Sequence, residues 1–208
     1  MQNVRRMSKG VFIGFFLAGL IVSFASRLLE TEALPLFGRP IGTMVPWPMF
    51  LVVGSVGAFF LYGSALAVII FIYDMWRSIQ DRHARTSPGL ALALLLIPVF
   101  NIYWAFQALW GLAKDYNGYI RRYHVNTPPL PEGLFLTASI TFSVSYLPVL
   151  FRLIGSLLDW AGLSAGFTAV LGGISIAANL AGWANLVIIP IVMSRGCDAS
   201  NAIRNVAA

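Results

Sequence analysis

Charged residues are scarce in this chain, and their scarcity indicates the class of protein. Only 11% of the 208 residues are charged, whereas 58% are hydrophobic and the mean hydropathy is +0.78. A soluble domain carries about 25% charged residues. So few charges do not cover a water-facing surface. The composition therefore predicts an all-α polytopic membrane helix bundle, because a helix satisfies its own backbone groups in lipid.

The basic residues outnumber the acidic ones and give a net charge of +6. They stand between apolar runs and do not form one long basic stretch. This placement is typical of charges that set membrane topology beside anionic lipid. We therefore expect the lipid bilayer as a partner and no nucleic acid.

Cysteine and histidine are also scarce. Cys197 is the single cysteine, which excludes an internal disulfide, and His83 and His124 are too few for several metal or haem sites. Asp74, Asp81 and His83 lie close in sequence, but their spacing matches no recognised metal site. We expect these three residues to form a solvated loop face, and we expect neither a metal nor a cofactor.

One short motif is typical of a hydrolase. Residues 162–166 match the Gly-x-Ser-x-Gly pattern, which needs a strand before it and a histidine and a carboxylate nearby. Here a predicted membrane helix precedes the motif, and both histidines fall in loops predicted on the opposite side. We therefore expect a small-residue helix start with Ser164 as its N-cap, and no enzyme activity.

Four apolar runs are long enough to cross a bilayer. They comprise about residues 11–29, 49–73, 134–158 and 165–193. The first run also fits a signal peptide with a cleavage site near Ala25, but we expect it to remain as the first span. Residues 30–48 contain several prolines and are expected to form a loop, because proline interrupts a helix.

Residues 89–124 do not fit a simple crossing. The apolar part before Pro98 would form roughly 14 Å of helix, which is half of a bilayer, and Pro98 disfavours helix at Ile97. After Asn101, apolar residues recur at helical spacings: Ile102, Phe106, Leu109, Ala113, Tyr116, Ile120 and Tyr123. The pattern predicts a re-entrant hairpin that continues into an interfacial amphipathic helix.

The positions of Lys and Arg distinguish two topologies. If residues 89–110 crossed the bilayer, the fourteen basic residues would divide seven to seven and give no orientation. If the chain turns back at residues 98–101, eleven lie on one side, and only Arg27, Arg39 and Arg152 lie on the other. The positive-inside rule favours the second arrangement, with four spans and both termini cytoplasmic. It predicts a location in the bacterial inner (plasma) membrane.

Polar residues in the third long run are candidates for binding a ligand or a partner. Thr141, Ser145 and Arg152 share one helix face. Arg152 either extends outward to pair with Asp159 or lipid, or anchors an anionic ligand or a partner subunit. In the second case Thr141 and Ser145 would line a polar groove.

A second polar group lies at the predicted break and comprises Asn101, Tyr103 and Gln107. These side chains either satisfy backbone groups that Pro98 and the turn leave free, or form a midplane site made by a broken helix, as transporters use. No Asp or Glu lies in a predicted span to couple protons or cations, which disfavours the transporter interpretation.

Small residues predict the faces on which helices pack closely. They include Gly54, Gly57 and Gly63 in the second run, and Ala165, Ala169, Gly173, Ala177 and Ala181 in the last, with Asn185 next in the series. Three basic residues, Lys114, Arg121 and Arg122, are expected to meet anionic phospholipid headgroups.

Two stretches carry a resemblance to a known family. The run IPVFNIYW at residues 97–104 and the run GLAKDYN at residues 111–117 resemble a pattern found in uncharacterised bacterial multi-pass membrane proteins. Residues 198–202 are similar to the ends of those proteins. The resemblance covers about a third of the chain. It implies a bacterial membrane protein and brings no catalytic residue, because the family has no established activity.

The expected function is therefore non-catalytic. We expect an accessory or scaffold subunit that packs by small-residue helix faces within a larger membrane assembly or against itself. The alternative is a small-solute or lipid carrier or channel that uses the break at residues 98–101 and the polar face ending at Arg152. An enzyme acting on lipid is the least favoured interpretation.

Overall fold

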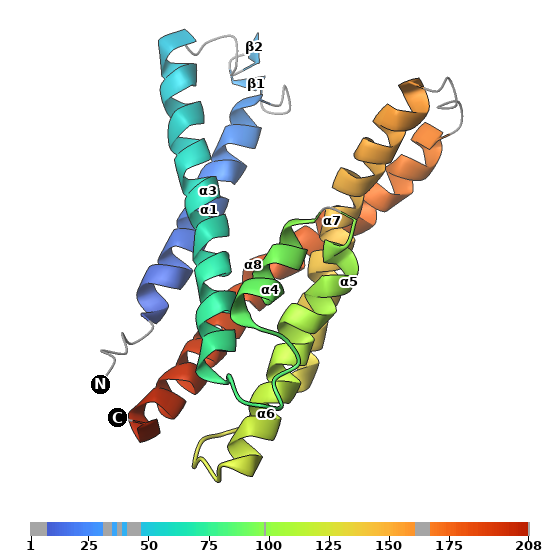
Figure 1. Ribbon diagram of the computed structural model, residues 1–208. Helices are drawn as coiled ribbons and strands as arrows, with labels where there is room; N and C mark the ends of the chain where they lie inside the picture. Colours follow the sequence, from blue (N-terminus) through green and yellow to red (C-terminus); the bar gives the residue numbers. More distant parts are fainter. Residues whose placement is uncertain are drawn as a thin grey trace. The chain divides into compact units, whose positions relative to one another are not determined.

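The computed structural model of the protein describes residues 8–30, 35–36, 39–40, 47–97, 99–160 and 167–207. These residues are almost entirely helical, as the composition predicts, apart from two strands of two residues each (Figure 1). They form two compact units, one of residues Ser8–Phe71 and one that begins at Ile72. The boundary between the units falls within a helix, α3.

The first unit contains α1 (Lys9–Glu30), most of α3 (Trp47–Ser78) and an antiparallel pair of strands, β1 (Pro35–Leu36) and β2 (Arg39–Pro40). The rings of Phe12 and Phe71 meet edge to face with their centroids 6.1 Å apart. A Cβ atom on Gly63 would lie only 3.1 Å from the ring of Phe15. The predicted close packing at Gly63 is therefore confirmed, and α1 is the helix that uses it.

The second unit begins with the last turns of α3, which end at Ser78, five residues beyond the predicted run. A loop of residues 79–87 follows, and the chain then forms α4 (Pro88–Ala93) and a turn of 3₁₀ helix (Leu94–Leu96). Ser87 caps α4, because its hydroxyl accepts a hydrogen bond from the Leu90 backbone N–H at 3.2 Å. Ile97, directly before the proline, is extended (φ −83°, ψ 113°), as the sequence predicts.

The chain reverses after Ile97. The Trp104 indole N–H donates to the Ala91 carbonyl at 3.0 Å, and the Asp115 carboxylate accepts from the Arg85 backbone N–H at 3.0 Å. Residues before the reversal therefore lie against residues after it in antiparallel order. The described residues on either side of position 98 thus form a helical hairpin, and its re-entry into a membrane stays a prediction.

The helix after the reversal runs from Asn101 to Arg122 in three parts. These are α5 (Asn101–Ala105), a π-helical turn (Phe106–Gly111) and α6 (Leu112–Arg122). The π turn holds an extra residue in the helix, as such insertions do. α6 ends with His124 in the left-handed region (φ 49°), and the Val125 N–H donates to the Ile120 carbonyl at 3.0 Å, which makes a Schellman cap.

The amphipathic pattern of this helix is confirmed, but protein covers its apolar face. Ala113, Tyr116 and Ile120 are buried, and the Tyr116 hydroxyl reaches the Ala199 carbonyl of α8 (Phe167–Ala207). Whether this helix also lies at the membrane interface stays a prediction. The basic residues of α6, Lys114, Arg121 and Arg122, remain exposed or half-buried, whereas Asp115 is buried.

Two long helices complete the unit, α7 (Glu132–Trp160) and α8. Within them, Glu132–Ser156 and Gly173–Asn205 are long and apolar enough to cross a membrane. Each contains one interior proline, Pro148 or Pro190. α8 extends fourteen residues beyond the predicted run 165–193, because Val192, Met193, Cys197 and Ile203 continue a buried helical face.

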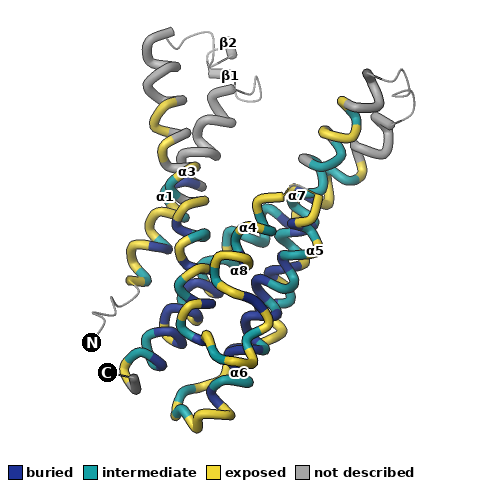
Figure 2. The backbone as a smooth tube through the Cα atoms, viewed as in Figure 1, coloured by how far each residue is buried: buried dark blue, intermediate teal, exposed yellow. Residues whose placement is uncertain are grey.

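Burial divides the second unit into two regions (Figure 2). Fully buried side chains gather around the end of α3, α6, the start of α7 and the end of α8, with Trp76, Tyr116 and Phe135 the largest. Many large apolar side chains elsewhere in the unit are exposed: Tyr73, Leu90, Leu96, Ile97, Val99, Phe100, Tyr103, Ile140, Leu153, Ile154, Ile176, Leu180, Trp183, Val187 and Ile191. We call the first region the packed base and the second the apolar stem.

Candidate functional site

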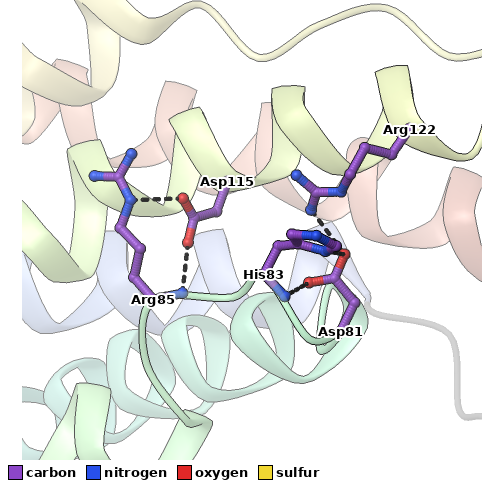
Figure 3. A network of polar contacts seen from close by, with 5 residues as sticks. All are labelled: Asp81, His83, Arg85, Asp115 and Arg122. Carbon is purple, nitrogen blue, oxygen red and sulfur yellow. Dashed lines mark hydrogen bonds and ion pairs between the residues drawn. The ribbon is translucent and has the colours of Figure 1, made fainter.

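Polar side chains in the packed base join the loop of residues 79–87 to α6 (Figure 3). We call this set the loop clasp, and it consists of Asp81, His83, Arg85, Asp115 and Arg122. The Arg85 Nε lies 2.8 Å from Asp115 Oδ1, and the Arg122 Nη2 lies 2.7 Å from Asp81 Oδ2. Each carboxylate also accepts a backbone N–H, from Arg85 and from His83 respectively. Two carboxylates thus hold the loop at both of its ends.

The aspartates of the clasp are largely removed from water. The exposed fractions of the Asp81 and Asp115 side chains are 6% and 8%. Burial alone would raise the pKa of Asp81, but the hydrogen bonds from Arg122 and the His83 N–H and the positive charge of Arg122 outweigh it and hold the pKa below its ordinary value. The expected solvated loop face is therefore wrong for Asp81. Asp74 is separate from it and lies 4.0 Å from Arg204.

Asn117 attaches the segment between α6 and α7 to α6 through hydrogen bonds. Its Nδ2 donates to the Leu130 carbonyl at 2.9 Å and to Glu132 Oε1 at 3.1 Å, and its Oδ1 accepts from the Leu130 N–H at 2.8 Å. These bonds attach the start of α7 to α6. Sequence reasoning missed this residue, because its partners are thirteen and fifteen positions away in a loop without periodicity.

The hydroxyl residues of α7 form two groups. Ser139 and Ser143 face the helix after the reversal, where Ser143 donates to the Ile102 carbonyl at 3.1 Å and Ser139 lies 3.3 Å from the Ala105 carbonyl. Thr141 and Ser145 face α8 and meet Asn185, at 2.6 Å and 3.4 Å. The predicted face containing Thr141 and Ser145 is therefore an internal polar contact, and Asn185 is the partner that the sequence left unassigned.

The two candidates at the break lie apart. Asn101 is buried, with 4% of its surface exposed, and its Oδ1 atom has no hydrogen-bond partner in the described part of the chain. Gln107 instead donates to the Tyr103 hydroxyl at 3.3 Å on the exposed side. Within the described part of the chain, neither side chain is hydrogen-bonded to a backbone group that the turn leaves free. Whether either residue binds a ligand stays a prediction.

The three residues predicted to meet headgroups have different surroundings. The Lys114 ammonium lies 3.2 Å from the centroid of the Trp110 ring, which is a cation–π contact. Arg122 is bound to Asp81, whereas Arg121 is exposed and makes no ion pair within the described residues. Of these three residues, only Lys114 both lacks an ion-pair partner among the described residues and contacts a tryptophan, a residue type that is enriched at membrane interfaces.

The small-residue series on α8 divides between two environments. Ala181 is buried against the protein, whereas Gly173 and Ala177 are exposed, and nothing lies within 4 Å of where a Cβ on Gly173 would be. The side-chain surroundings of Gly54, Gly57, Arg152 and Ala169, and the whole of residues 162–166, lie outside what the structure describes.

Comparison with protein-family models, with curated proteins and with solved structures finds no match to this chain. The chemistry of the described residues therefore rests on their geometry. The clasp and the Asn117 contacts are saturated with partners and act structurally. Among the predicted site residues that the structure describes, Gly173, Ala177, Asn101, Lys114 and Arg121 remain open to a further contact.

Proposed function

We propose that the protein is a non-catalytic integral membrane protein of a bacterial plasma membrane that acts as an accessory or scaffold subunit. In this proposal the chain crosses four times, re-enters at Pro98, and keeps both termini on the cytoplasmic side. Its apolar stem lies in lipid, and its packed base lies in the cytoplasm.

The distribution of exposed apolar side chains supports the membrane placement. Exposed residues of the stem, such as Ile140, Leu180 and Val187, would be costly in water, since each large apolar side chain gains about 1.5–3 kcal/mol on burial. Charged residues of the second unit belong to the base, with the exception of Arg152 and Asp159, whose side chains are not described. Such a division matches the boundary between hydrocarbon and water.

The contacts across the reversal support the re-entrant topology. If residues 89–110 crossed the membrane, the loop of residues 79–87 and α6 would lie on opposite sides of a hydrocarbon core of about 30 Å. Ion pairs of 2.8 Å and 2.7 Å between them favour a common side. The exposed apolar residues at the tip, Ile97, Val99 and Phe100, are suited to contact with lipid.

The exposed face of α8 carries the proposal of a subunit role. Gly173 and Ala177 lie one turn apart and leave the backbone accessible, and Ile176 and Leu180 flank them with exposed side chains. Close packing on small residues is the usual basis of helix association in lipid. Among the described residues of this unit, Ala181 of the same series is buried, whereas these two positions are exposed.

Purification from native membranes in mild detergent tests this proposal. We expect a stoichiometric partner chain, or a second copy of this chain, to remain bound. Replacing Ala177 by Leu should release it without lowering the thermal midpoint, because that position is exposed. The matched variant Ala181→Leu should lower the midpoint instead, because Ala181 is buried. A monodisperse single chain whose behaviour is unchanged by Ala177→Leu would refute the subunit role.

A carrier or channel is the second candidate, and the unpaired Oδ1 of Asn101 favours it. A buried acceptor without a donor costs about 1–3 kcal/mol, and a passing solute with an N–H or O–H would supply the donor. In this case vesicles containing the protein should swell in glycerol, and Asn101→Leu should abolish the swelling. If the acceptor serves no solute, Asn101→Leu should only raise the thermal midpoint.

A further inference from the structure

The boundary between stem and base can be located on three helical segments. The last exposed large apolar residues are Tyr73 on α3, Tyr103 on α5 and Ile191 on α8. Directly beyond them the apolar side chains become buried, as Met75 and Val192 illustrate. Under the membrane placement proposed above, this boundary corresponds to the edge of the hydrocarbon core.

Three basic residues follow this boundary closely. Arg77 and Arg195 each lie four residues beyond the last exposed apolar residue of their helix, or about 6 Å along the axis. Both are exposed and make no ion pair within the part of the chain that the structure describes. Lys114 is the third, and its ammonium rests on Trp110.

Contacts between the helices place these three at a similar depth. The Trp76 indole donates to the Ala108 carbonyl at 3.1 Å, so that Arg77, the next residue, lies level with the turn that contains Trp110. The Tyr116 hydroxyl reaches the Ala199 carbonyl, so these two residues lie at a similar depth. Four residues earlier on each helix, Leu112 and Arg195 are therefore level as well. A side chain on a helix points toward its N-terminus, which brings the Lys114 ammonium back to Trp110.

We propose that Arg77, Lys114 and Arg195, the headgroup cations, bind the phosphodiester groups of anionic phospholipids. The inference rests on the membrane placement of the proposed function. Their depth matches a headgroup layer of about 5–8 Å on each side of the core. Charge complementarity selects anionic over zwitterionic lipid, and Trp110 is the type of side chain that occupies this layer.

The same reasoning removes Arg121 and Arg122 from the lipid surface. Arg121 lies nine residues beyond Leu112, the level of Arg195, and seven residues beyond Lys114, or about 10–14 Å farther along α6. Arg122 is already neutralised by Asp81 at 2.7 Å. Arg82 follows Asp81 in the loop, is exposed, and lies at this distal end as well. Arg82 and Arg121 therefore supply a control of equal charge outside the headgroup layer.

The test uses the full chain in nanodiscs that contain equal parts of phosphatidylcholine and phosphatidylglycerol. The ratio of the two lipids that remain bound after extraction is measured by native mass spectrometry. A cation near the surface contributes about fivefold in affinity for anionic lipid, so that the double variant Arg77→Gln/Arg195→Gln should lower the phosphatidylglycerol enrichment by about 25-fold. Lys114→Gln should lower it by about fivefold.

The double variant Arg82→Gln/Arg121→Gln should leave the enrichment within about twofold of the native value, because these arginines lie beyond the headgroup layer. An equal loss in both double variants would show that net charge, and not the position of the headgroup cations, attracts the lipid, and would overturn the inference. No enrichment in the native protein would overturn it as well. A chain that does not enter the nanodiscs would instead refute the membrane placement.

Discussion

The Arg85–Asp115 pair is the contact of the loop clasp whose removal has the most direct consequence. Asp115 accepts two bonds from one residue, Arg85 Nε at 2.8 Å and the Arg85 backbone N–H at 3.0 Å. In Asp115→Asn, the amide oxygen can keep the backbone bond, but the amide nitrogen then faces the guanidinium as a second donor. The variant therefore loses one charge-assisted bond and places two donors against each other.

The expected loss follows from the exposure of the two partners. A hydrogen bond to a charged group contributes about 1.5–3 kcal/mol to stability. The Asp115 side chain is 8% exposed, but the Arg85 side chain is 50% exposed, so that water replaces part of what the guanidinium loses. We therefore expect Asp115→Asn to lower the free energy of unfolding by about 1–2 kcal/mol, toward the lower end of that range.

Unfolding by titration with sodium dodecyl sulfate in mixed micelles measures this change. Hydrogen exchange should increase in residues 79–87, because the clasp holds that loop on α6. A double-mutant cycle with Arg85→Gln isolates the energy of the pair. Asp115→Asn should lower the free energy of unfolding by less in the Arg85→Gln background than in the native chain. An unchanged midpoint together with unchanged exchange in the loop would refute the structural role of the clasp.

Three further predictions concern the same base. Asn117→Ala removes three hydrogen bonds from a buried position and should lower the free energy of unfolding by about 2–3 kcal/mol, with faster exchange at Leu130 as the local readout. The native pKa of Asp81 lies below its ordinary 3.8, so its ionised form stabilises the fold above about pH 4. This contribution should disappear as the pH falls below that value. In Asp81→Asn, the free energy of unfolding should therefore depend less on pH in this acid range. His124→Gly should raise the thermal midpoint, since a left-handed conformation costs a residue with a Cβ atom about 1–2 kcal/mol; an unchanged or lower midpoint would contradict this.

Local sequence signals predicted the helices and the reversal well. The apolar runs indicate the long helices, and Pro98 with Asn101 indicates the hairpin, because proline acts through the backbone of its direct neighbours. The ends of α3 and α8 were predicted too early. Asp74 suggested a loop, and the last apolar run appeared to end at residue 193. The helices instead continue with their charges on the outer face and with Trp76 and Met193 on the buried one.

The polar contacts were harder to predict, because they depend on how distant segments meet. Thr141 and Ser145 were identified from their common helix face, but the face alone does not reveal Asn185 as the partner. Asp115 pairs with a residue thirty positions away, across a reversal whose geometry no local pattern determines. The aromatic and aliphatic spacing of α6 correctly indicated one apolar face, and the cover of that face by α8 became visible only in the fold.

The π-helical turn at Phe106–Gly111 has a consequence for insertions and deletions in this chain. Each residue of an α-helix turns the chain by about 100°. An extra residue in a continuous α-helix would therefore turn everything after it by about that angle. The wider π turn takes up one extra residue, so that α6 keeps nearly the phase of a helix one residue shorter. We expect deletion of one residue in this turn to restore a continuous α-helix and to leave Asp115 and Asn117 facing Arg85 and Leu130, whereas insertion of a further residue would turn them away.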